Sequence, residues 1–179
     1  SDFEPGQAGQ PDWLVDCRGL GARPQWAGLR GVRGEVIRLH APDVTLSRPV
    51  RLIHPRYPLY IAPKQDGVFV IGATEIESDD TSPASVRSSL ELLSAAYSVH
   101  KGFAEARILE ISAQVRPTLA DNLPAIRLEG GQHHIHINGL YRHGFLIAPA
   151  LLDAALGLMA GSHELAQSLG IRVMGEKQA

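Results

Sequence analysis

The sequence has a single cysteine, Cys17, among its 179 residues, so no intramolecular disulfide can form. Disulfide-stabilised folds belong to oxidising compartments, and this lack predicts a cytoplasmic protein. Long apolar runs are also missing, since no stretch approaches the roughly 18 residues that a membrane span needs. The polar start SDFEPGQAGQPD lacks the apolar segment of a secretory signal peptide. We therefore expect a soluble, untargeted protein with no membrane partner.

Basic charge is not in excess either. The 17 Lys and Arg residues are balanced by 19 Asp and Glu, which gives a formal net charge of -2 and a pI near 6.4. Binding to phosphate backbones requires clustered cationic side chains, and here they are scattered. The composition therefore predicts that nucleic acid is not a partner.

The length bounds the architecture. A chain of 179 residues can bury one good core, so one domain or two interlocked lobes are expected. Residues 1–12 are rich in Gly, Gln and Pro and show no periodicity, which predicts a disordered lead. No repeat or low-complexity segment follows.

Short strands dominate the first half of the chain. The apolar run 13–17 predicts a buried strand that ends at the glycines of a tight turn. Alternating segments then predict an antiparallel block, with strands at 32–40, 50–53, 59–62 and 68–73. Turn residues separate them at 41–43, 54–56 and 65–67, the last an Asp-Gly pair typical of hairpins.

A helix is expected next, capped by Thr81 or Ser82, with Pro83 in its first turn and an end near Lys101. Its apolar side chains recur at helical spacing at Val86, Leu90, Leu93 and Tyr97. The mixture of antiparallel strands and helices predicts the α+β class.

The second half of the chain predicts a long strand at 106–118, another at 133–138 and a turn at 139–144. A nearly continuous apolar segment then predicts a largely buried helix that begins near Pro149. A short helix at 164–168 and a strand at 171–174 complete the chain.

Two arginines are candidate ligand-binding groups. Arg142 lies on the turn between a strand and a helix, where backbone N–H groups and the positive helix end face an anion or electron-rich oxygens. Arg116 is held at a strand end because Pro117 keeps the chain extended. Two convergent guanidinium groups suggest a carboxylate ligand, which arginine binds in bidentate fashion. A solvated Arg142 and a structural ion pair at Arg116 are the alternatives.

Tyr57 and Tyr60 are candidate pocket residues. Strand alternation places them on opposite faces, so only one can line a given pocket. A buried tyrosine more often packs and finds a backbone partner, and that alternative stays open.

Other candidate sites are discounted. His134 and His136 share one face of a strand, next to His133, but no Asp or Glu nearby completes a ligand set and Cys17 is distant in sequence, so we expect no metal. The stretch 19–24 fails as a dinucleotide fingerprint because Pro24 occupies the third glycine position.

Several segments together resemble the second half of glycine oxidases in the D-amino-acid oxidase superfamily. In chain order they are 16–22, 29–35, 60–64, 71–75, 115–121 with Pro124, and 139–146. The resemblance runs from about Trp13 to Leu158. It implies a flavin-domain strand and glycine turn at 13–28, a substrate-binding antiparallel lobe at 29–113, and a return to the flavin domain at 114–179.

The resemblance also implies the chemistry. The cofactor would be FAD, and the loop and helix start that face it would be Leu140, Tyr141, Arg142, His143, Gly144, Phe145 and Leu146. Arg116 and Arg142 would bind the carboxylate of a small amino-acid substrate, and Tyr60 would line the pocket. In this family hydride passes from the substrate Cα to the flavin, and oxygen then reoxidises the flavin with release of hydrogen peroxide.

Within the resemblance, the leading expectation is a glycine oxidase that supplies an imine to thiamine thiazole synthesis. A D-amino-acid or sarcosine oxidase, or a dehydrogenase with another electron carrier, is the first alternative. A non-catalytic binding module without the cofactor domain is the second. The oligomeric state is left open, and a homo-oligomer is compatible with the sequence.

The chain departs from the family at two places. The amino-terminal Gly-rich βαβ unit is missing, so an amino-terminal flavin-binding half is an expected partner and the chain alone is expected to be inactive. The sequence leaves open whether this truncation is natural, engineered or proteolytic. Arg127 stands where relatives usually have glycine, and 128–132 is expected to be an unusual loop.

Overall fold

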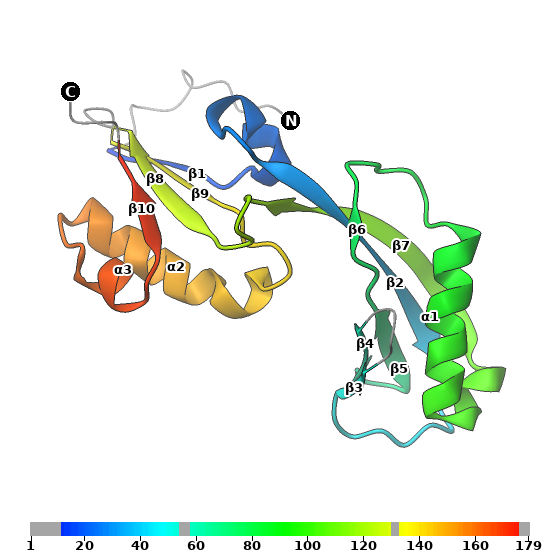
Figure 1. The fold of residues 1–179 in the computed structure, drawn as a ribbon. Coiled ribbons are helices and arrows are strands. Elements are labelled where there is room, and N and C mark those ends of the chain that lie inside the picture. The colour runs from blue at the N-terminus through cyan, green and yellow to red at the C-terminus, as the bar shows by residue number, and fades with distance from the viewer. Residues whose placement is uncertain (1–11, 54–57, 130–132, 176–179) are drawn as a thin grey trace. The chain divides into compact units, whose positions relative to one another are not determined.

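The computed structural model describes residues 12–53, 58–129 and 133–175. It contains two compact units, which we call the split unit (Ser1–Arg30 with Arg116–Ala179) and the central unit (Gly31–Val115). Figure 1 shows the elements of both. Within the described residues, no helix combines the length and apolarity needed to cross a lipid bilayer.

The split unit contains a four-stranded sheet in the order β1-β9-β8-β10. Its strands are β1 (Leu14–Asp16), β9 (His134–Asn138), β8 (Ala125–Glu129) and β10 (Arg172–Met174). Strand β1 pairs parallel to β9, β9 antiparallel to β8, and β8 parallel to β10.

The strands predicted at 13–17, 133–138 and 171–174 are confirmed in this sheet, but the first is not a buried strand. Val15 is exposed because β1 is an edge strand of the described sheet, paired on one side with β9. The loop expected at 128–132 is also wrong for its first two residues, because Leu128 and Glu129 belong to β8. Residues 130–132 lie outside the described part of the chain.

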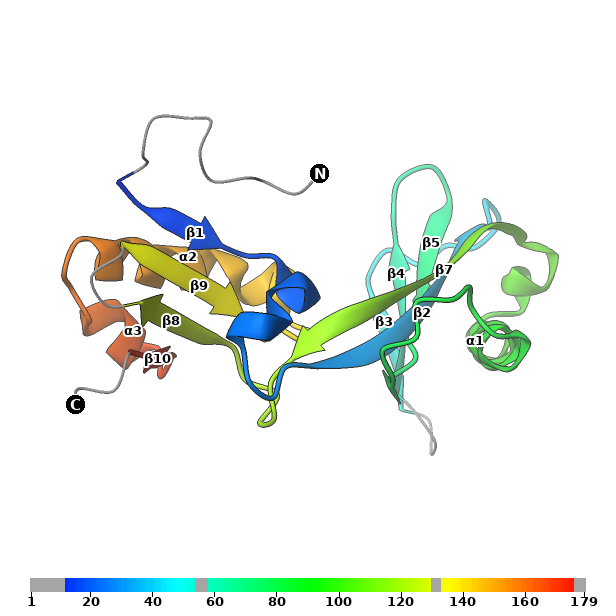
Figure 2. The same ribbon diagram turned by 90° about the horizontal axis from the view of Figure 1, so that it is seen from above.

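Helix α2 (Gly144–Met159) covers one face of this sheet, followed by α3 (Glu164–Ser168), as Figures 1 and 2 show. Its contact face consists of Leu151, Ala154, Ala155 and Leu158, which pack with Ile126, Ile135 and Ile137. The burial of this apolar surface is what holds helix and sheet together.

Two expectations about α2 are wrong. The helix begins at Gly144 and includes Pro149, which lacks an N–H and so removes one backbone bond in the second turn. It is also not largely buried, because Leu152 and Leu156 on its outer face are exposed. A helix that packs on one side of a sheet can bury only one stripe of its surface, even when its sequence is apolar all round.

The central unit is built on an antiparallel sheet of order β3-β4-β5-β2-β6, with β7 also paired to β2. Its strands are β2 (Arg30–His40), β3 (Val50–Ile53), β4 (Pro58–Pro63), β5 (Val68–Gly72), β6 (Ile76–Glu77) and β7 (Arg107–Thr118). The predicted antiparallel block is confirmed. The turn predicted at 54–56 lies outside the described residues.

The hairpin between β4 and β5 has the geometry that its Asp-Gly pair predicts. Asp66 and Gly67 have φ values of 56° and 67°. Two successive residues with positive φ are typical of the type I′ turn, whose twist matches that of the flanking strands. The turn also fixes the register that places Tyr60 opposite Gly72.

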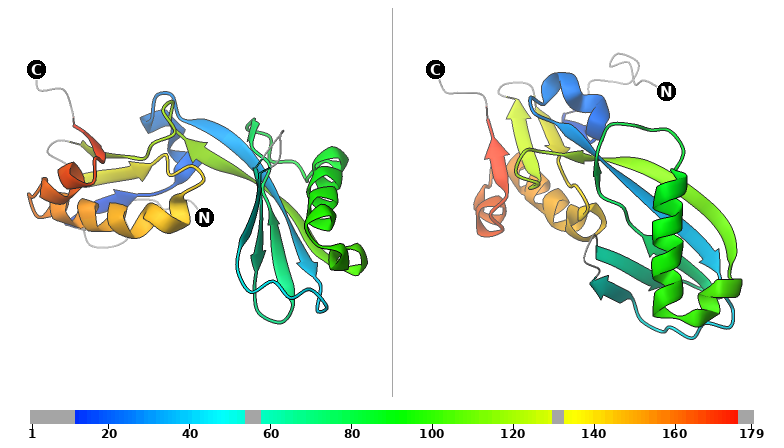
Figure 3. Two further views of the ribbon diagram at one scale, coloured as in Figure 1. Left: turned by 60° about the horizontal axis from the view of Figure 1, so that its bottom comes forward. Right: turned by 45° about the vertical axis from the view of Figure 1, so that its right-hand side comes forward.

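Helix α1 (Val86–Val99) packs against β4 and β5, as Figure 3 shows. Its N-cap is Ser85, whose side chain accepts a hydrogen bond from the N–H of Ser88, and not Thr81 or Ser82 as expected. Short 3-10 helices lie at Gly19–Gln25 (η1) in the split unit and Lys101–Glu105 (η2) after α1.

Of the four apolar residues expected at helical spacing on α1, Leu93 packs against the core of the central unit and the other three do not. Val86, Leu90 and Tyr97 are exposed, whereas Leu92, Ala95 and Ala96 are buried against the sheet. Small side chains let the helix approach the strands closely, so the alanines take the contact that the larger residues were expected to make.

Arg33 and Glu35 alternate with apolar residues along β2, yet both are buried. An Arg33 guanidinium nitrogen lies 2.7 Å from Oε1 of Glu35. The same guanidinium donates to the carbonyl oxygens of Asp80 at 2.6 Å and Pro83 at 2.9 Å. These bonds pair the two buried charges, so a polar pair can occupy the interior between β2 and the segment that leads into α1, although Oε2 of Glu35 is buried without a hydrogen bond among the described residues.

Candidate substrate and flavin site

The segment between β9 and α2 forms a sharply turned loop of residues 139–143. Gly139 and Tyr141 have positive φ values of 78° and 51°. A Cβ on Gly139 would lie 2.7 Å from Cγ of Leu119, so both the backbone conformation and the close packing require glycine there. The loop therefore has a fixed path at its first residue.

Buried Asn138 fastens this loop to the turn after β1. Its Oδ1 accepts a hydrogen bond from the N–H of Gly139 at 2.8 Å, and its Nδ2 donates to the carbonyl oxygen of Gly19 at 2.9 Å. A second connection joins the loop to β7, because the N–H of Tyr141 donates to the carbonyl oxygen of Pro117 at 3.2 Å. Three segments that are distant in sequence thus meet at one end of the split unit.

This convergence brings the segments of the two candidate arginines together. The hydrogen bond joins Pro117, which follows Arg116, to Tyr141, which precedes Arg142. Arg116 is half-buried at the end of β7, and Arg142 is exposed on the loop. Their roles as carboxylate ligands stay predictions.

The third predicted substrate residue, Tyr60, belongs to the central unit and lies on β4. Its side chain is partly exposed, at 40% of its full accessible surface. Tyr57, its expected counterpart on the opposite face, lies outside the described residues. The role of Tyr60 as a pocket residue also stays a prediction.

The N-terminus of α2 has the features that a flavin edge would need. No side chain caps it, and the N–H groups of Leu146 and Ile147 both turn back to the carbonyl oxygen of His143. The first N–H groups of a helix have no acceptor within the helix, so those of Gly144 and Phe145 point beyond its end. Phe145 and Leu146 expose apolar side chains beside these donors. Backbone donors next to apolar surface fit the oxygen-bearing edge of a flavin ring.

The histidines of β9 have carboxylates beside them, which corrects the argument made from the sequence. Strand β1 places Asp16 opposite His136, and β8 places Glu129 opposite His134. Nδ1 of His136 lies 3.2 Å from Oδ2 of Asp16, and its Nε2 lies 3.1 Å from Oε1 of Glu129. The assumption that no Asp or Glu completes a ligand set is therefore wrong, because the carboxylates come from neighbouring strands.

Two pKa shifts follow from this arrangement. The Arg18 side chain, which hydrogen-bonds Asp16, lowers the pKa of that carboxyl to about 2 and outweighs the opposing effect of burial. Burial lowers the pKa of His136, and the neighbouring His134 lowers it further. The cluster therefore pairs an ionised carboxylate with an imidazole that favours its neutral form.

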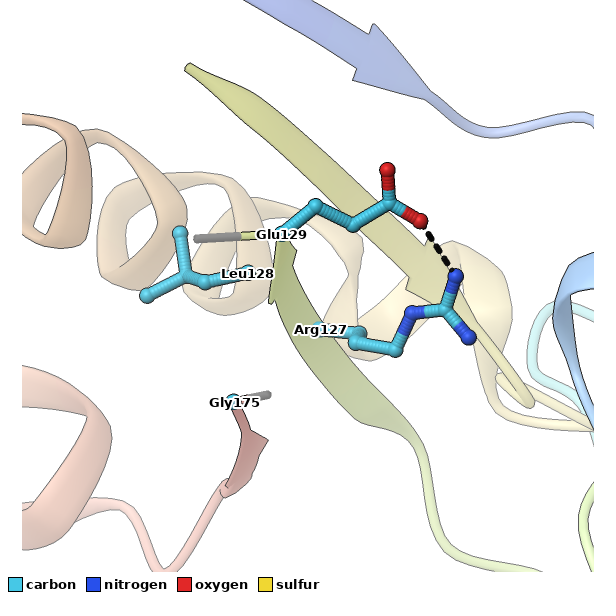
Figure 4. A pocket seen from close by; sticks show the side chains of 4 residues that line it. All are labelled: Arg127, Leu128, Glu129 and Gly175. Atoms are coloured by element: carbon cyan, nitrogen blue, oxygen red, sulfur yellow. Dashed lines mark hydrogen bonds and ion pairs between the residues drawn. The ribbon is translucent and has the colours of Figure 1, made fainter. Parts of the chain in front are cut away.

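A pocket of about 310 Å³ opens elsewhere on the split unit, lined by Arg127, Leu128, Glu129 and Gly175 (Figure 4). Arg127 Nη2 lies 2.6 Å from Oε1 of Glu129 in an ion pair across its rim, and the same guanidinium also donates to the carbonyl oxygen of Gln25. None of the predicted substrate residues lines this pocket. Arg127 is thus held by partners within the split unit.

Sequence reasoning did not identify Asn138 as the residue that organises the site. A short amide immediately before a glycine with positive φ is a common device for bonding nearby backbone groups, and this is the signal that could have revealed it. The bond from Asn138 to Gly19 joins distant parts of the chain, which no local pattern predicts.

Comparison with known proteins identifies the family. The model of the DAO family, described as FAD dependent oxidoreductase, matches residues 4–152. A Rhizobium etli protein, assigned to thiamine biosynthesis as the oxidoreductase ThiO, is 54% identical over 140 residues, which cover 78% of this chain and 42% of the relative. The chain thus spans less than half the length of this relative.

Solved structures show the same fold. Glycine oxidase from Geobacillus kaustophilus superposes with a TM-score of 0.71 at 24% identity, over 84% of this chain and 42% of that one. Iminodiacetate oxidase from Chelativorans sp. BNC1 gives a TM-score of 0.73 at 23% identity, over 88% and 44%. The predicted α+β, D-amino-acid-oxidase-like fold is therefore confirmed. The chain belongs to the DAO family of FAD-dependent oxidoreductases.

Proposed function

We propose that this chain supplies the substrate-binding part and the flavin-facing loop of an oxidase that deaminates glycine or a similarly small amino acid. The observation that carries the proposal is the hydrogen bond from Tyr141 to Pro117, which joins the segments of Arg142 and Arg116. The identity of 54% to the Rhizobium etli relative supports a place in thiamine thiazole synthesis.

The two arginines bind the substrate carboxylate. A guanidinium offers paired N–H donors in a plane that matches the two oxygens of a carboxylate. Arg142 would reach the ligand from the loop and Arg116 from the strand end. Tyr60 is the pocket residue that the family resemblance implies. A substrate with a small side chain keeps its Cα close to this anchor, which fixes the C–H bond that must break.

Bound FAD would supply the acceptor for hydride from the substrate Cα and the route for electrons to oxygen or to another carrier. The chain contributes the loop and helix start that face the cofactor: Leu140, Tyr141, Arg142, His143, Gly144, Phe145 and Leu146. The backbone N–H groups at the start of α2 would stabilise negative charge on a flavin bound against them. The remaining contacts to FAD come from the amino-terminal half that the family resemblance implies.

The location that fits this function is the cytoplasm. Cys17 is exposed and free, and a reducing compartment preserves such a thiol. Thiol labelling of the protein in intact cells tests this assignment. A Cys17 side chain recovered in a mixed disulfide would contradict it.

The experiment is a peroxide assay on the enzyme in which this chain is joined to an amino-terminal flavin-binding half. Glycine, sarcosine and D-alanine are compared, each with an artificial electron acceptor in a parallel assay. Glycine is expected to give the highest kcat/KM. A preference for D-alanine or sarcosine would reassign the substrate, and no turnover of any amine by a flavin-loaded protein would favour a non-catalytic binding module.

A further inference from the structure

Several ionisable side chains lie together on the face of the split-unit sheet that points away from α2, among them Arg127, which lies opposite His136 and pairs with Glu129 at 2.6 Å. Ile135 and Ile137 of β9 pack against α2, so His134 and His136, which alternate with them, face the other side. The register of β1 adds Asp16 opposite His136, and that of β8 adds Glu129 opposite His134. One donor atom from each of Asp16, His134 and His136 lies within 4.8 Å of the other two.

Three of the four ring nitrogens of this cluster are buried without a hydrogen bond among the described residues. His136 is 1% exposed, and neither its Nδ1 nor its Nε2 makes a hydrogen bond of acceptable geometry. Nε2 of His134 is also buried without one. Buried polar atoms are nearly always satisfied, so several in one place require an explanation.

Protein groups alone do not satisfy a neutral His136. Each of its nitrogens has a carboxylate oxygen within 3.2 Å, from Asp16 on one side and Glu129 on the other. A neutral imidazole carries one N–H, so it can donate to only one of the two carboxylates. The lone pair of the other nitrogen then faces a negatively charged oxygen. A cation placed between them would turn this repulsion into attraction.

We propose that Asp16, His134 and His136 bind a divalent transition-metal ion of the zinc class. Its ligands are Oδ2 of Asp16, Nε2 of His134 and Nδ1 of His136, and its fourth position is open to water or another ligand. Imidazole nitrogens with a carboxylate oxygen are a donor set that suits zinc and its neighbours better than calcium or magnesium.

Glu129 acts as the outer partner of both histidines. Its two oxygens lie 3.1 Å from Nε2 of His136 and 3.3 Å from Nδ1 of His134, which are the nitrogens left over by the ligand assignment. Metal-binding histidines almost always donate their second N–H to a carboxylate, carbonyl or water, which fixes the tautomer and orients the ring. The carboxylate of Glu129 provides the acceptor for the second N–H of both histidines.

Asp16, one of the three proposed ligands, is already held in place by Arg18. Oδ1 of Asp16 accepts hydrogen bonds from the backbone N–H and Nε of Arg18, both at 3.0 Å, and Oδ2 accepts one from Nη2 at 2.7 Å. The histidine rings are stacked, with centroids 4.0 Å apart and planes at 29°. Because a metal lies in the plane of each ligating ring, the two rings open away from each other on binding.

The test is a zinc titration of the untagged 179-residue chain after EDTA treatment and dialysis. Isothermal titration calorimetry with ZnCl₂ is expected to saturate at one ion per chain. His134→Asn is expected to abolish this binding, and Glu129→Gln to weaken it by about 10–100-fold. His163→Asn removes an exposed imidazole of the split unit that lies outside the cluster, and it is the control, for which unchanged affinity is expected.

X-ray absorption of the zinc-loaded chain identifies the ligands. Nitrogen and oxygen at about 2.0–2.2 Å are expected, without the sulfur at about 2.3 Å that a thiolate of Cys17 would give. A sulfur shell, no saturable binding, or equal affinity in His134→Asn and His163→Asn would each overturn the proposal. Circular dichroism of both variants without zinc shows whether they keep the fold. If His134→Asn does not fold, the loss of zinc affinity in Glu129→Gln tests the proposal instead.

This site is independent of the proposed oxidase function. None of its residues belongs to the predicted substrate set of Tyr60, Arg116 and Arg142. Zinc binding is measured without flavin or amine. A failure of the zinc titration would therefore leave the oxidase proposal standing, and a failure of the oxidase assay would leave the zinc proposal standing.

Discussion

The phenol of Tyr60 lies over the backbone of Gly72, its partner across the β4–β5 ladder. A Cβ on Gly72 would lie 2.5 Å from Oη of Tyr60 and 2.6 Å from Cζ. A glycine in the interior of a strand often marks a position where another group approaches closely, and here that group is an aromatic ring. Because Gly72 has no side chain, the Tyr60 ring can pack directly on the strand backbone.

Gly72→Ala is therefore expected to push the Tyr60 ring outward and to destabilise the protein by about 1–3 kcal/mol, the usual cost of inserting a methyl group into a packed position. Urea unfolding measures the effect. Gly175→Ala is the control, because a Cβ there meets nothing within 4 Å. In a Tyr60→Ala background the cost at Gly72 should shrink, and an unchanged cost would show that the tyrosine is not the cause.

The cap of α1 gives a second prediction. Ser85→Ala removes the oxygen that accepts from Ser88, and loss of such a cap costs about 0.5–2 kcal/mol of stability. Thr81→Ala changes an exposed residue outside the helix and is expected to stay within about 0.5 kcal/mol of the unchanged protein. Thermal unfolding of the two variants compares them. A larger loss of stability for Thr81→Ala than for Ser85→Ala would indicate that Thr81 caps the helix, as expected from the sequence.

Local signals in the sequence predicted much of the fold. The Asp-Gly turn, the strand at 50–53 and the helix at 164–168 each depend on residues adjacent in the chain, and the structure has them at those positions. The resemblance supplied what local signals could not, namely the family and the candidate residues Tyr60, Arg116 and Arg142.

Non-local pairing accounts for the main errors. The sequence gives no sign that β1 lies beside β9, so Asp16 was not expected near His136. Similarly, the partners that allow Arg33 to be buried include carbonyl oxygens of Asp80 and Pro83, far along the chain. Alternation predicts which residues share a face, but contacts between distant segments decide whether that face is solvated.

Asn138 provides a third prediction. Asn138→Ala removes the side-chain bonds to the buried N–H of Gly139 and the partly buried carbonyl oxygen of Gly19, which is expected to cost about 1–3 kcal/mol. Ser98→Ala deletes a partly exposed side-chain bond to Ala95 and serves as the control with a smaller loss. Hydrogen exchange should locate the change: faster exchange at Tyr141 is expected after Asn138→Ala, and unchanged exchange there would contradict the anchoring role.

A fourth prediction concerns the chain by itself. Because the Gly-rich dinucleotide-binding unit of the family is not among its 179 residues, the purified chain is expected to be colourless and without oxidase activity. Absorbance in the visible flavin bands after incubation with FAD and dialysis measures this. Stoichiometric flavin absorbance would show that the loop and start of α2 hold the cofactor without the other half.

The last prediction concerns the carboxylate clamp in the enzyme that includes a flavin-binding half. Arg142→Lys and Arg116→Lys each keep the charge but lose the paired N–H fork. Charge-assisted hydrogen bonds of this kind are worth roughly 1.5–3 kcal/mol, so KM for glycine is expected to rise by about 10–100-fold in each variant. Tyr60→Phe removes one neutral hydroxyl and should cost less than either.

Arg142→Lys is expected to be the more damaging of the two arginine variants, because its loop also leads into the flavin-facing start of α2. It should therefore shift the flavin absorbance spectrum, whereas Arg116→Lys should leave that spectrum unchanged. Steady-state kinetics with glycine and a spectrum of each purified variant provide both readouts. Wild-type KM values in both variants would show that these arginines form structural ion pairs and do not bind the substrate carboxylate.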